Sequence, residues 1–134
     1  MKKVLLPIDG SERSARALEM AKKICSPEET EIYIVKVIPS QLYMRDDEGR
    51  TQSAIDQSQL EAAAVSLMEY NVHTRMLRGS SPGVEILEFA KENKIDTVIM
   101  TRSSRGPLRK LGSVTTYLVK NASFLNIFVL REEE

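Results

Sequence analysis

Cysteine and histidine are almost absent from this 134-residue sequence, which contains one of each, Cys25 and His73. A single cysteine excludes an intramolecular disulfide framework and a metal site built from several cysteines, and a single histidine excludes a multi-histidine zinc or iron site. Long apolar runs are also absent, because no stretch approaches the roughly 18 residues that a membrane-spanning helix needs. The net charge is zero, with 19 Lys and Arg against 19 Asp and Glu, which argues against general nucleic-acid binding.

The composition is that of one folded domain. Apolar residues make up 42% of the chain and charged residues 28%, a balance typical of soluble globular proteins. The length suits a single domain over residues 1–134, and the sequence has no linker and no internal repeat. The opening MKKVLLPIDG holds only about five apolar residues before Asp9, too few for a signal peptide. We therefore expect a cytoplasmic protein with no membrane or nucleic-acid partner.

Short apolar runs alternate with helical patterns along the chain. The runs that predict strands are residues 3–8, 31–38, 72–77, 95–101 and 124–130. The segments between them carry apolar residues at the three- and four-residue spacings of a helix. The series expected on the buried face of the second helix is Leu60, Ala63, Ala64, Leu67 and Met68. Acidic residues and a glycine predict a surface loop over residues 40–51.

The expected element order is therefore β-α-β-α-β-α-β-α-β. Such strict alternation, with nearly continuous apolar strands, is typical of an α/β three-layer sandwich in which helices cover both faces of a parallel sheet. In sheets of this kind, ligands bind beyond the carboxyl ends of the strands, where the strand order reverses. The loops that begin at Asp9, Pro39, Arg78 and Arg102 all leave that edge.

Positive charge concentrates near the end of the chain. Residues 97–131 contain no acid and six bases, and four of these bases fall within residues 102–110. A basic segment at the ligand edge of the sheet is suited to attract an anion such as a phosphate. The alternative that the residues leave open is a solvated surface loop, the usual location of charged side chains.

Four segments, in order, resemble the universal stress protein family. VLLPIDGSERSARALEMA resembles the family's opening strand, turn and helix, and residues 31–38 resemble its second strand. Residues 79–90, with Gly79, Pro82, Ile86 and Ala90, resemble the segment before its fourth strand. LGSVTTYLV followed by NIFVL resembles its closing helix and strand. Each segment alone is a weak signal, but all four at the family's spacing are specific.

The resemblance implies an adenine nucleotide alpha hydrolase-like fold, with a five-stranded parallel sheet in the order 3-2-1-4-5. It also implies a homodimer formed by antiparallel pairing of the last strand across a twofold axis. The residues that would form this interface are Ile127, Phe128, Val129 and Leu130. An apolar edge strand needs a cover or a partner, which is compatible with that interface. Packing under helices within one chain is the alternative.

Some members of the family bind ATP through a loop of the form G-x2-G-x9-G-[ST] after the fourth strand. Here only Gly112-Ser113 matches. Counting back from Gly112 puts Ile99 and Arg102 at the other two glycine positions, and aligning from the end of the fourth strand puts Thr101 and Ser104 there, so neither alignment restores the glycines that let backbone N–H groups approach phosphates. The nucleotide-binding residues that the resemblance implies are Pro7, Asp9, Val37, Thr101, Ser104, Gly112, Ser113 and Val114. The bases expected to attract phosphates by charge are Arg102, Arg105 and Arg109.

The resemblance favours a regulatory or stress-response homodimer that is not a catalyst and binds ATP weakly or not at all. The alternative is an ATP- or AMP-binding switch, or a slow ATPase with Mg²⁺ beside the nucleotide, that uses Asp9 and Gly112-Ser113. A flavoprotein-like enzyme is disfavoured, because the chain has no room for a second domain. No catalytic residue and no protein-bound metal are predicted, since no recognisable nucleophile or acid–base pair is present.

Overall fold

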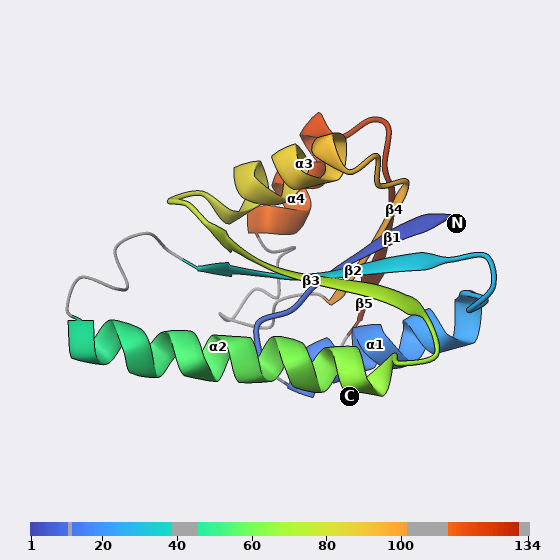
Figure 1. Cartoon of the computed structure of the whole chain (residues 1–134). Helices are drawn as coiled ribbons and strands as arrows, with labels where there is room; N and C mark the ends of the chain where they lie inside the picture. The colour runs from blue at the N-terminus through green and yellow to red at the C-terminus, as the bar shows by residue number, and fades with distance from the viewer. Residues whose placement is uncertain (11, 39–45, 102–112, 132–134) are drawn as a thin grey trace.

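A computed structural model describes residues 1–10, 12–38, 46–101 and 113–131, with the backbone alone at residues 12 and 46–52. Within these ranges, five parallel strands form one sheet in the order β3-β2-β1-β4-β5 (Figure 1). The strands are β1 (Lys3–Pro7), β2 (Glu31–Ile38), β3 (Asn71–Arg78), β4 (Thr97–Thr101) and β5 (Asn126–Leu130). The helices are α1 (Glu12–Ile24), α2 (Asp46–Ser66), α3 (Pro82–Glu92) and α4 (Ser113–Asn121). The α/β sandwich and the strand order predicted from the sequence are confirmed.

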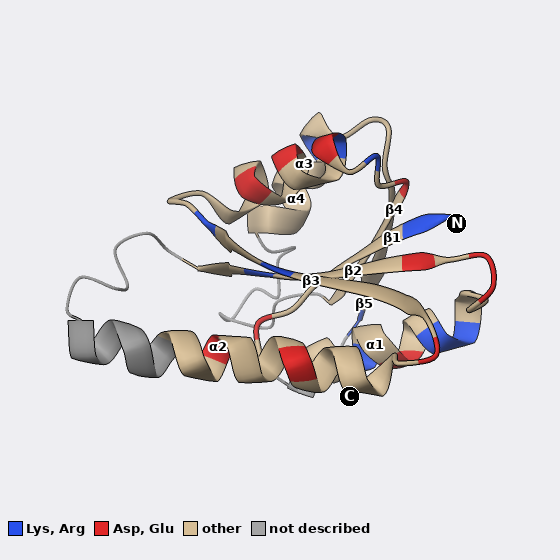
Figure 2. Cartoon of the chain, in the orientation of Figure 1, with Lys and Arg blue, Asp and Glu red and all other residues tan. Residues whose placement is uncertain are grey.

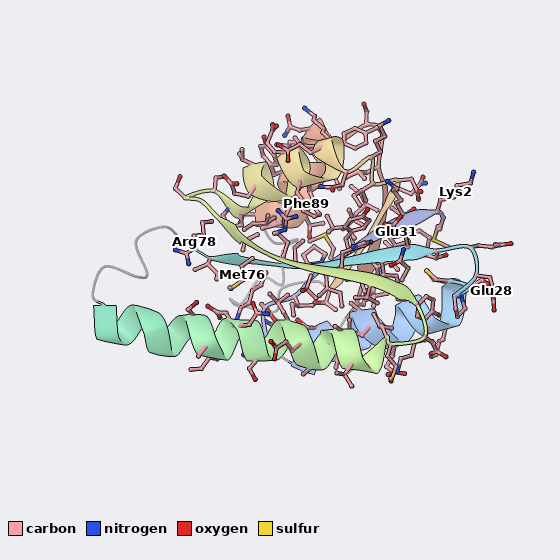
Figure 3. All side chains as sticks on the ribbon, viewed as in Figure 1. Lys2, Glu28, Glu31, Met76, Arg78 and Phe89 are labelled. Carbon is pink, nitrogen blue, oxygen red and sulfur yellow. The ribbon has the colours of Figure 1, made fainter. Side chains whose placement is uncertain are left out.

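Helices cover both faces of the sheet. In Figure 1, α1 and α2 lie on one face, and α3 and α4 lie on the other. Because successive side chains of a strand point to opposite faces, Val4 and Leu6 pack with α1 and α2, whereas Leu5 packs with α3 and α4. Figure 3 shows the side chains that fill the two interlayer spaces. No helix in the described part of the chain is both long enough and apolar enough to cross a membrane.

The second helix begins earlier than expected. The sequence predicts a loop over residues 40–51, but α2 starts at Asp46. The loop prediction is therefore wrong for residues 46–51. The acidic residues that suggested a loop also suit the first turn of a helix, because the N-terminus of a helix carries partial positive charge. The glycine in this stretch costs only about 1 kcal/mol in a helix interior.

The same helix also ends earlier than its apolar spacing suggests. Leu60, Ala63 and Leu67 are buried as expected, but Met68 is 80% exposed. The expectation that Met68 lies in the core is therefore wrong. The reason is that α2 ends at Ser66, so Met68 lies in the turn before β3, where helical periodicity no longer applies.

The two edge strands differ in how they are protected. On the α3 side of β3, the His73 ring stacks on Tyr33 with 4.7 Å between ring centroids. The Arg75 guanidinium lies 6.0 Å from the centre of the Phe89 ring. Polar side chains thus cover the apolar surface beside this strand, a usual way to protect an edge. On β5, by contrast, Phe128 is 40% exposed.

Asp96 connects β1, β4 and β5 at the amino edge of the sheet. Its carboxylate accepts hydrogen bonds from the backbone N–H groups of Lys2 and Lys3, at 2.9 and 2.8 Å, and from the Thr97 hydroxyl, at 2.7 Å. Burial raises the pKa of Asp96, but the Thr97 hydroxyl and the two backbone N–H groups outweigh burial and hold the pKa below its usual value. The backbone carbonyl of Asp96 also accepts the N–H of Asn126 at the start of β5.

We expect Asp96→Asn to lower the free energy of unfolding by about 1.5–3 kcal/mol at pH 7, the usual contribution of a hydrogen bond to a charged group. A lowered pKa in the folded state means that this stabilisation is complete above the unfolded pKa and is lost as the pH falls through the folded pKa. The difference between the variant and the wild type, measured by urea unfolding, should therefore shrink at pH 3. Glu92→Gln, on an exposed position of α3, is the control. An equal difference at both pH values would contradict this account.

Candidate nucleotide site

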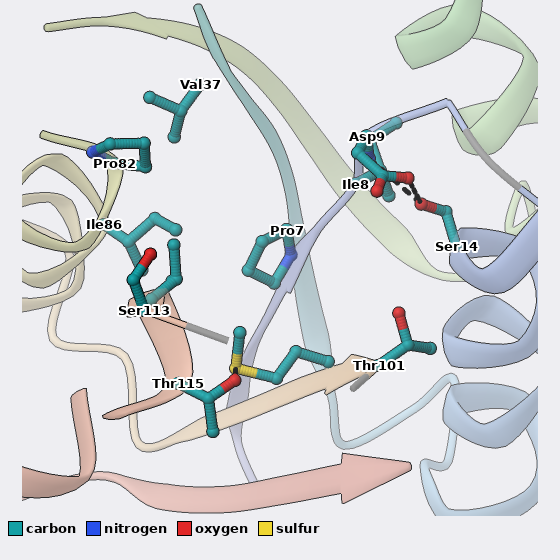
Figure 4. A pocket seen from close by; sticks show the side chains of 12 residues that line it. Pro7, Ile8, Asp9, Ser14, Val37, Pro82, Ile86, Thr101, Ser113 and Thr115 are labelled. Atoms are coloured by element: carbon teal, nitrogen blue, oxygen red, sulfur yellow. Dashed lines mark hydrogen bonds between the residues drawn. The ribbon is translucent and has the colours of Figure 1, made fainter. Parts of the chain in front are cut away.

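A cavity of about 330 Å³ lies beyond the carboxyl ends of the central strands (Figure 4). It forms there because β1 has β2 on one side and β4 on the other, so the chain reverses its direction across the sheet between β1 and β4. Loops that leave such neighbouring strands run to opposite faces and leave a crevice between them. The residues that line the cavity are Pro7, Ile8, Asp9, Ser14, Val37, Pro82, Ile86, Met100, Thr101, Ser113, Val114 and Thr115.

One side of the cavity is apolar. Pro7 is the last residue of β1, Val37 lies near the end of β2, and Ile86 belongs to α3. Figure 4 shows Val37, Pro82 and Ile86 grouped on one side of Pro7. Ile86 is 2% exposed, and Val37 packs against the same core cluster, so this wall is held by the interior of the protein. Such a surface favours an apolar group.

The opposite side is polar and is organised by Ser14. The Ser14 hydroxyl donates to Asp9 Oδ1 at 2.8 Å and accepts the backbone N–H of Asp9 at 3.0 Å (Figure 4). Ser14 is 8% exposed and lies in the first turns of α1, whereas the Asp9 side chain is 59% exposed. The Arg13 guanidinium lies 3.4 Å from Asp9 Oδ2. A buried serine therefore holds a carboxylate whose oxygens can accept hydrogen bonds at the cavity.

The N-terminus of α4 forms the third wall. Ser113, Val114 and Thr115 are its first three residues, and all three line the cavity. The backbone N–H groups of a first helical turn have no partners within the helix, and they carry the positive end of the helix dipole. Thr115 is 2% exposed, and its hydroxyl donates to Met100 Sδ at 3.6 Å. This wall is suited to an anion such as a phosphate.

The structure brings together six of the residues that the sequence implied for a nucleotide site. These residues are Pro7, Asp9, Val37, Thr101, Ser113 and Val114. Ser104 and Gly112 lie outside the described residues, as do the bases Arg102, Arg105 and Arg109.

The sequence analysis did not identify six of the lining residues, which are Ile8, Ser14, Pro82, Ile86, Met100 and Thr115. A serine five residues after an aspartate is a weak capping signal, and nothing in the sequence shows that Ile86 faces a cavity.

The fold and the cavity define an α/β protein with an open cavity at the switch point of a parallel sheet. The chain belongs to the universal stress protein family, whose family model matches residues 1–124. It is 29% identical to the universal stress protein MJ0531 of Methanocaldococcus jannaschii over 132 residues. That match covers 90% of this chain and 77% of the relative.

Solved structures share the fold. The hypothetical protein MJ0577 superposes with a TM-score of 0.83 at 24% identity, over 99% of this chain and 97% of that chain. A universal stress protein in complex with cAMP gives a TM-score of 0.74 at 20% identity, over 97% and 96% of the two chains. A universal stress protein family protein of Arabidopsis thaliana with AMP bound gives 0.70 at 20% identity, over 99% and 93%.

We expect Ser14→Ala to lower the free energy of unfolding by about 1.5 kcal/mol, because the substitution removes a hydrogen bond to a carboxylate and leaves the Asp9 N–H without its serine acceptor. Urea unfolding monitored by circular dichroism measures this change. Ser58→Ala, at an exposed position of α2, should stay within about 0.5 kcal/mol of the wild type. Equal effects of the two substitutions would contradict the role assigned to Ser14.

Proposed function

We propose that this protein is a regulatory universal stress protein that binds an adenine nucleotide weakly in the cavity at the switch point and does not use it catalytically. The observation that carries the proposal is the composition of this cavity. An apolar wall, a carboxylate and a helix N-terminus surround one space of about 330 Å³, and these are the three kinds of surface that suit a base, a ribose and a phosphate. Relatives of the same fold have cAMP or AMP bound.

The apolar wall suits the base and Asp9 suits the sugar. An adenine ring would bury its apolar faces against Pro7, Val37 and Ile86, and burial of apolar surface contributes roughly 25 cal/mol per Å². The ribose hydroxyls can donate hydrogen bonds to the Asp9 carboxylate, which Ser14 holds in place. Hydrogen bonds to a charged acceptor are the stronger kind.

We expect the affinity to be weak because of the residues that would surround the phosphate. The first turn of α4 offers backbone N–H groups to a phosphate. Thr101, however, ends β4, and aligning the family's nucleotide-binding loop from this point puts Thr101 in the place of a glycine. A side chain there keeps the backbone N–H groups farther from phosphate oxygens. The bases that follow in the sequence attract anions only through screened charge.

The lining of the cavity supports a role without catalysis. Among the described residues that line it, Asp9 alone has an acidic or basic side chain. His73 Nε2 lies 2.6 Å from Glu31 Oε1. This pair lies at the amino end of β2 and β3, on the opposite edge of the sheet from the cavity. A single carboxylate supplies neither a nucleophile with its base nor an acid–base pair. The nucleotide would therefore act as a signal and not as a substrate.

We expect Mg-ATP and AMP to bind with dissociation constants above about 100 μM at physiological salt, which is weaker than roughly −5.5 kcal/mol. Val37→Glu should weaken binding at least about tenfold, because it places a charge against the base and removes apolar surface. Val65→Glu, at a position of α2 that is 66% exposed, is the matched control. Isothermal titration calorimetry and NMR titration measure the affinities.

Other outcomes of this titration separate the alternatives. Sub-micromolar binding of ATP, or release of phosphate at a rate that exceeds a buffer blank, would favour the nucleotide switch or slow ATPase over the present proposal. Binding that occurs only at low salt and is lost in Arg102→Ala with Arg105→Ala would show charge attraction without a formed site.

We also propose that two copies of the chain associate through β5. In the described sheet β5 lies at the edge, paired with β4. Ile127, Val129 and Leu130 are only partly buried, and Phe128 is 40% exposed. The exposed apolar side chains Val119 and Phe124 lie close by in the sequence, at 59% and 45% exposure. An apolar open edge of this kind favours pairing with the same strand of a second copy.

We expect Ile127→Lys and Val129→Lys to shift the protein from dimer to monomer in sedimentation velocity, because a lysine on each copy brings like charges together in an apolar interface. Val65→Lys, which adds the same charge on the exposed side of α2, should leave the sedimentation coefficient unchanged. Unchanged coefficients in both β5 variants would contradict an interface at this strand.

A further inference from the structure

A buried ion pair lies between β2 and α2, on the face of the sheet opposite the apolar wall of the cavity. Lys36 Nζ lies 2.5 Å from Asp56 Oδ1, and the Lys36 and Asp56 side chains are 12% and 1% exposed. Lys36 Nζ also donates to Gln59 Oε1. Lys36 immediately precedes Val37, and neighbouring strand residues point to opposite faces. The cluster of Lys36, Asp56 and Gln59 therefore lies on the α2 face, and the apolar wall of the cavity lies on the other face.

Apolar packing already attaches α2 to the sheet. Leu60 and Ala63 of this helix, and Leu67 directly after it, are buried in the same cluster as strand residues. A buried ion pair adds little to stability compared with an apolar replacement of equal volume, because both charges must leave water. The better-supported role of a buried ion pair is to favour one packing of the surrounding side chains over the alternatives. The arrangement fixed here includes the orientation of the Gln59 side chain.

The Gln59 side chain contacts the turn that follows β1. Gly10 has a φ of +82°, and a Cβ at this position would lie 2.4 Å from Gln59 Nε2 and 2.6 Å from Gln59 Cδ. The amide group thus packs directly on the backbone of Gly10. Figure 1 shows the chain passing beside α2 where it leaves β1. A side chain held by Lys36 therefore limits how far the Asp9-Gly10 turn can move toward α2.

We propose that Gln59, oriented by the Lys36–Asp56 pair, is a positioning residue that holds the Asp9-Gly10 turn at the ribose end of the cavity. This inference rests on the proposed nucleotide function for its ligand, but the position of the turn can be measured without one. Ser14 fixes the direction of the Asp9 carboxylate, and Gln59 fixes the backbone that carries it. The Gln59 side chain contacts the backbone of Gly10 directly. Because glycine has no side chain that could adjust, a movement of Gln59 would be passed on to the turn.

The first experiment measures the turn without a ligand. The Asp9 N–H is bonded to Ser14 Oγ, so its hydrogen exchange reports how well the turn is held. Gln59→Ala should raise its exchange rate about tenfold, while the amide of Ile34 in the centre of β2 keeps its protection. Gln57→Ala is the matched control, because Gln57 is an exposed glutamine of the same helix that bonds Glu61 at 3.3 Å. An Asp9 exchange rate within twofold of the wild type would overturn the inference.

The second experiment measures the consequence for a ligand. AMP and 2′,3′-dideoxy-AMP are titrated into the wild type and both variants by NMR. Gln59→Ala should weaken AMP about five- to tenfold, the effect of one hydrogen bond, and should leave the dideoxy compound unchanged. Equal losses for both compounds, or no loss for AMP, would overturn the positioning role. If the wild type bound neither compound while Gln59→Ala still loosened Asp9, the nucleotide proposal would fail and the structural role of Gln59 would stand.

A second variant covers the case in which Gln59→Ala fails to fold. Lys36→Met combined with Asp56→Leu replaces the ion pair by apolar side chains of similar volume, which proteins commonly tolerate. This double variant releases Gln59 from Lys36 and should raise Asp9 exchange as Gln59→Ala does. Normal protection of Asp9 in the folded double variant would show that the ion pair does not orient Gln59.

Discussion

The complete burial of β1 is the constraint on which the rest of the structure depends. Val4, Leu5 and Leu6 are 0% exposed, with a strand on each side and a helical layer on each face. A strand in that position must be apolar throughout, and parallel neighbours must be joined by crossovers that place helices on both faces. The chain therefore adds β2 and β3 on one side of β1, and then crosses back over the sheet to add β4 and β5 on the other side.

The cavity is a direct consequence of this return. The polar residues Asp9 and Ser14 follow β1, and the first turn of α4 reaches the same place from the far half of the sheet. The Asp9 carboxylate is largely exposed, and the backbone N–H groups in the first turn of α4 have no partners within the helix, so both can contact a ligand. On the α2 face of the sheet, Lys36 bonds both the buried Asp56 and Gln59, and the Gln59 side chain packs on the turn after β1. The proposed ribose contact thus depends on a helix that does not line the cavity.

Much of the fold was predictable from the sequence, for a physical reason. Strands buried on both faces appear as continuous apolar runs, and β2 and β4 show this pattern clearly. Helix ends were less predictable. The apolar spacing continues through Met68 although α2 ends at Ser66, because spacing records which residues are apolar and not where the backbone turns. The acidic start of α2 was misread as a loop, since acidic residues suit both a loop and a first helical turn.

The sequence by itself determined the α/β class, the family and the residues at the ends of the central strands, because these follow from apolar periodicity and from local motifs. It placed Asp9, Val37 and Ser113 at the same edge of the sheet. Only the tertiary structure decided that Ser14 bonds Asp9 and that Gln59 packs on Gly10. The contact of Gln59 joins residues 49 positions apart through helix packing, and the Ser14 bond depends on side-chain rotamers. Neither leaves a repeating pattern in the order of the amino acids, so both became visible only when the chain was folded.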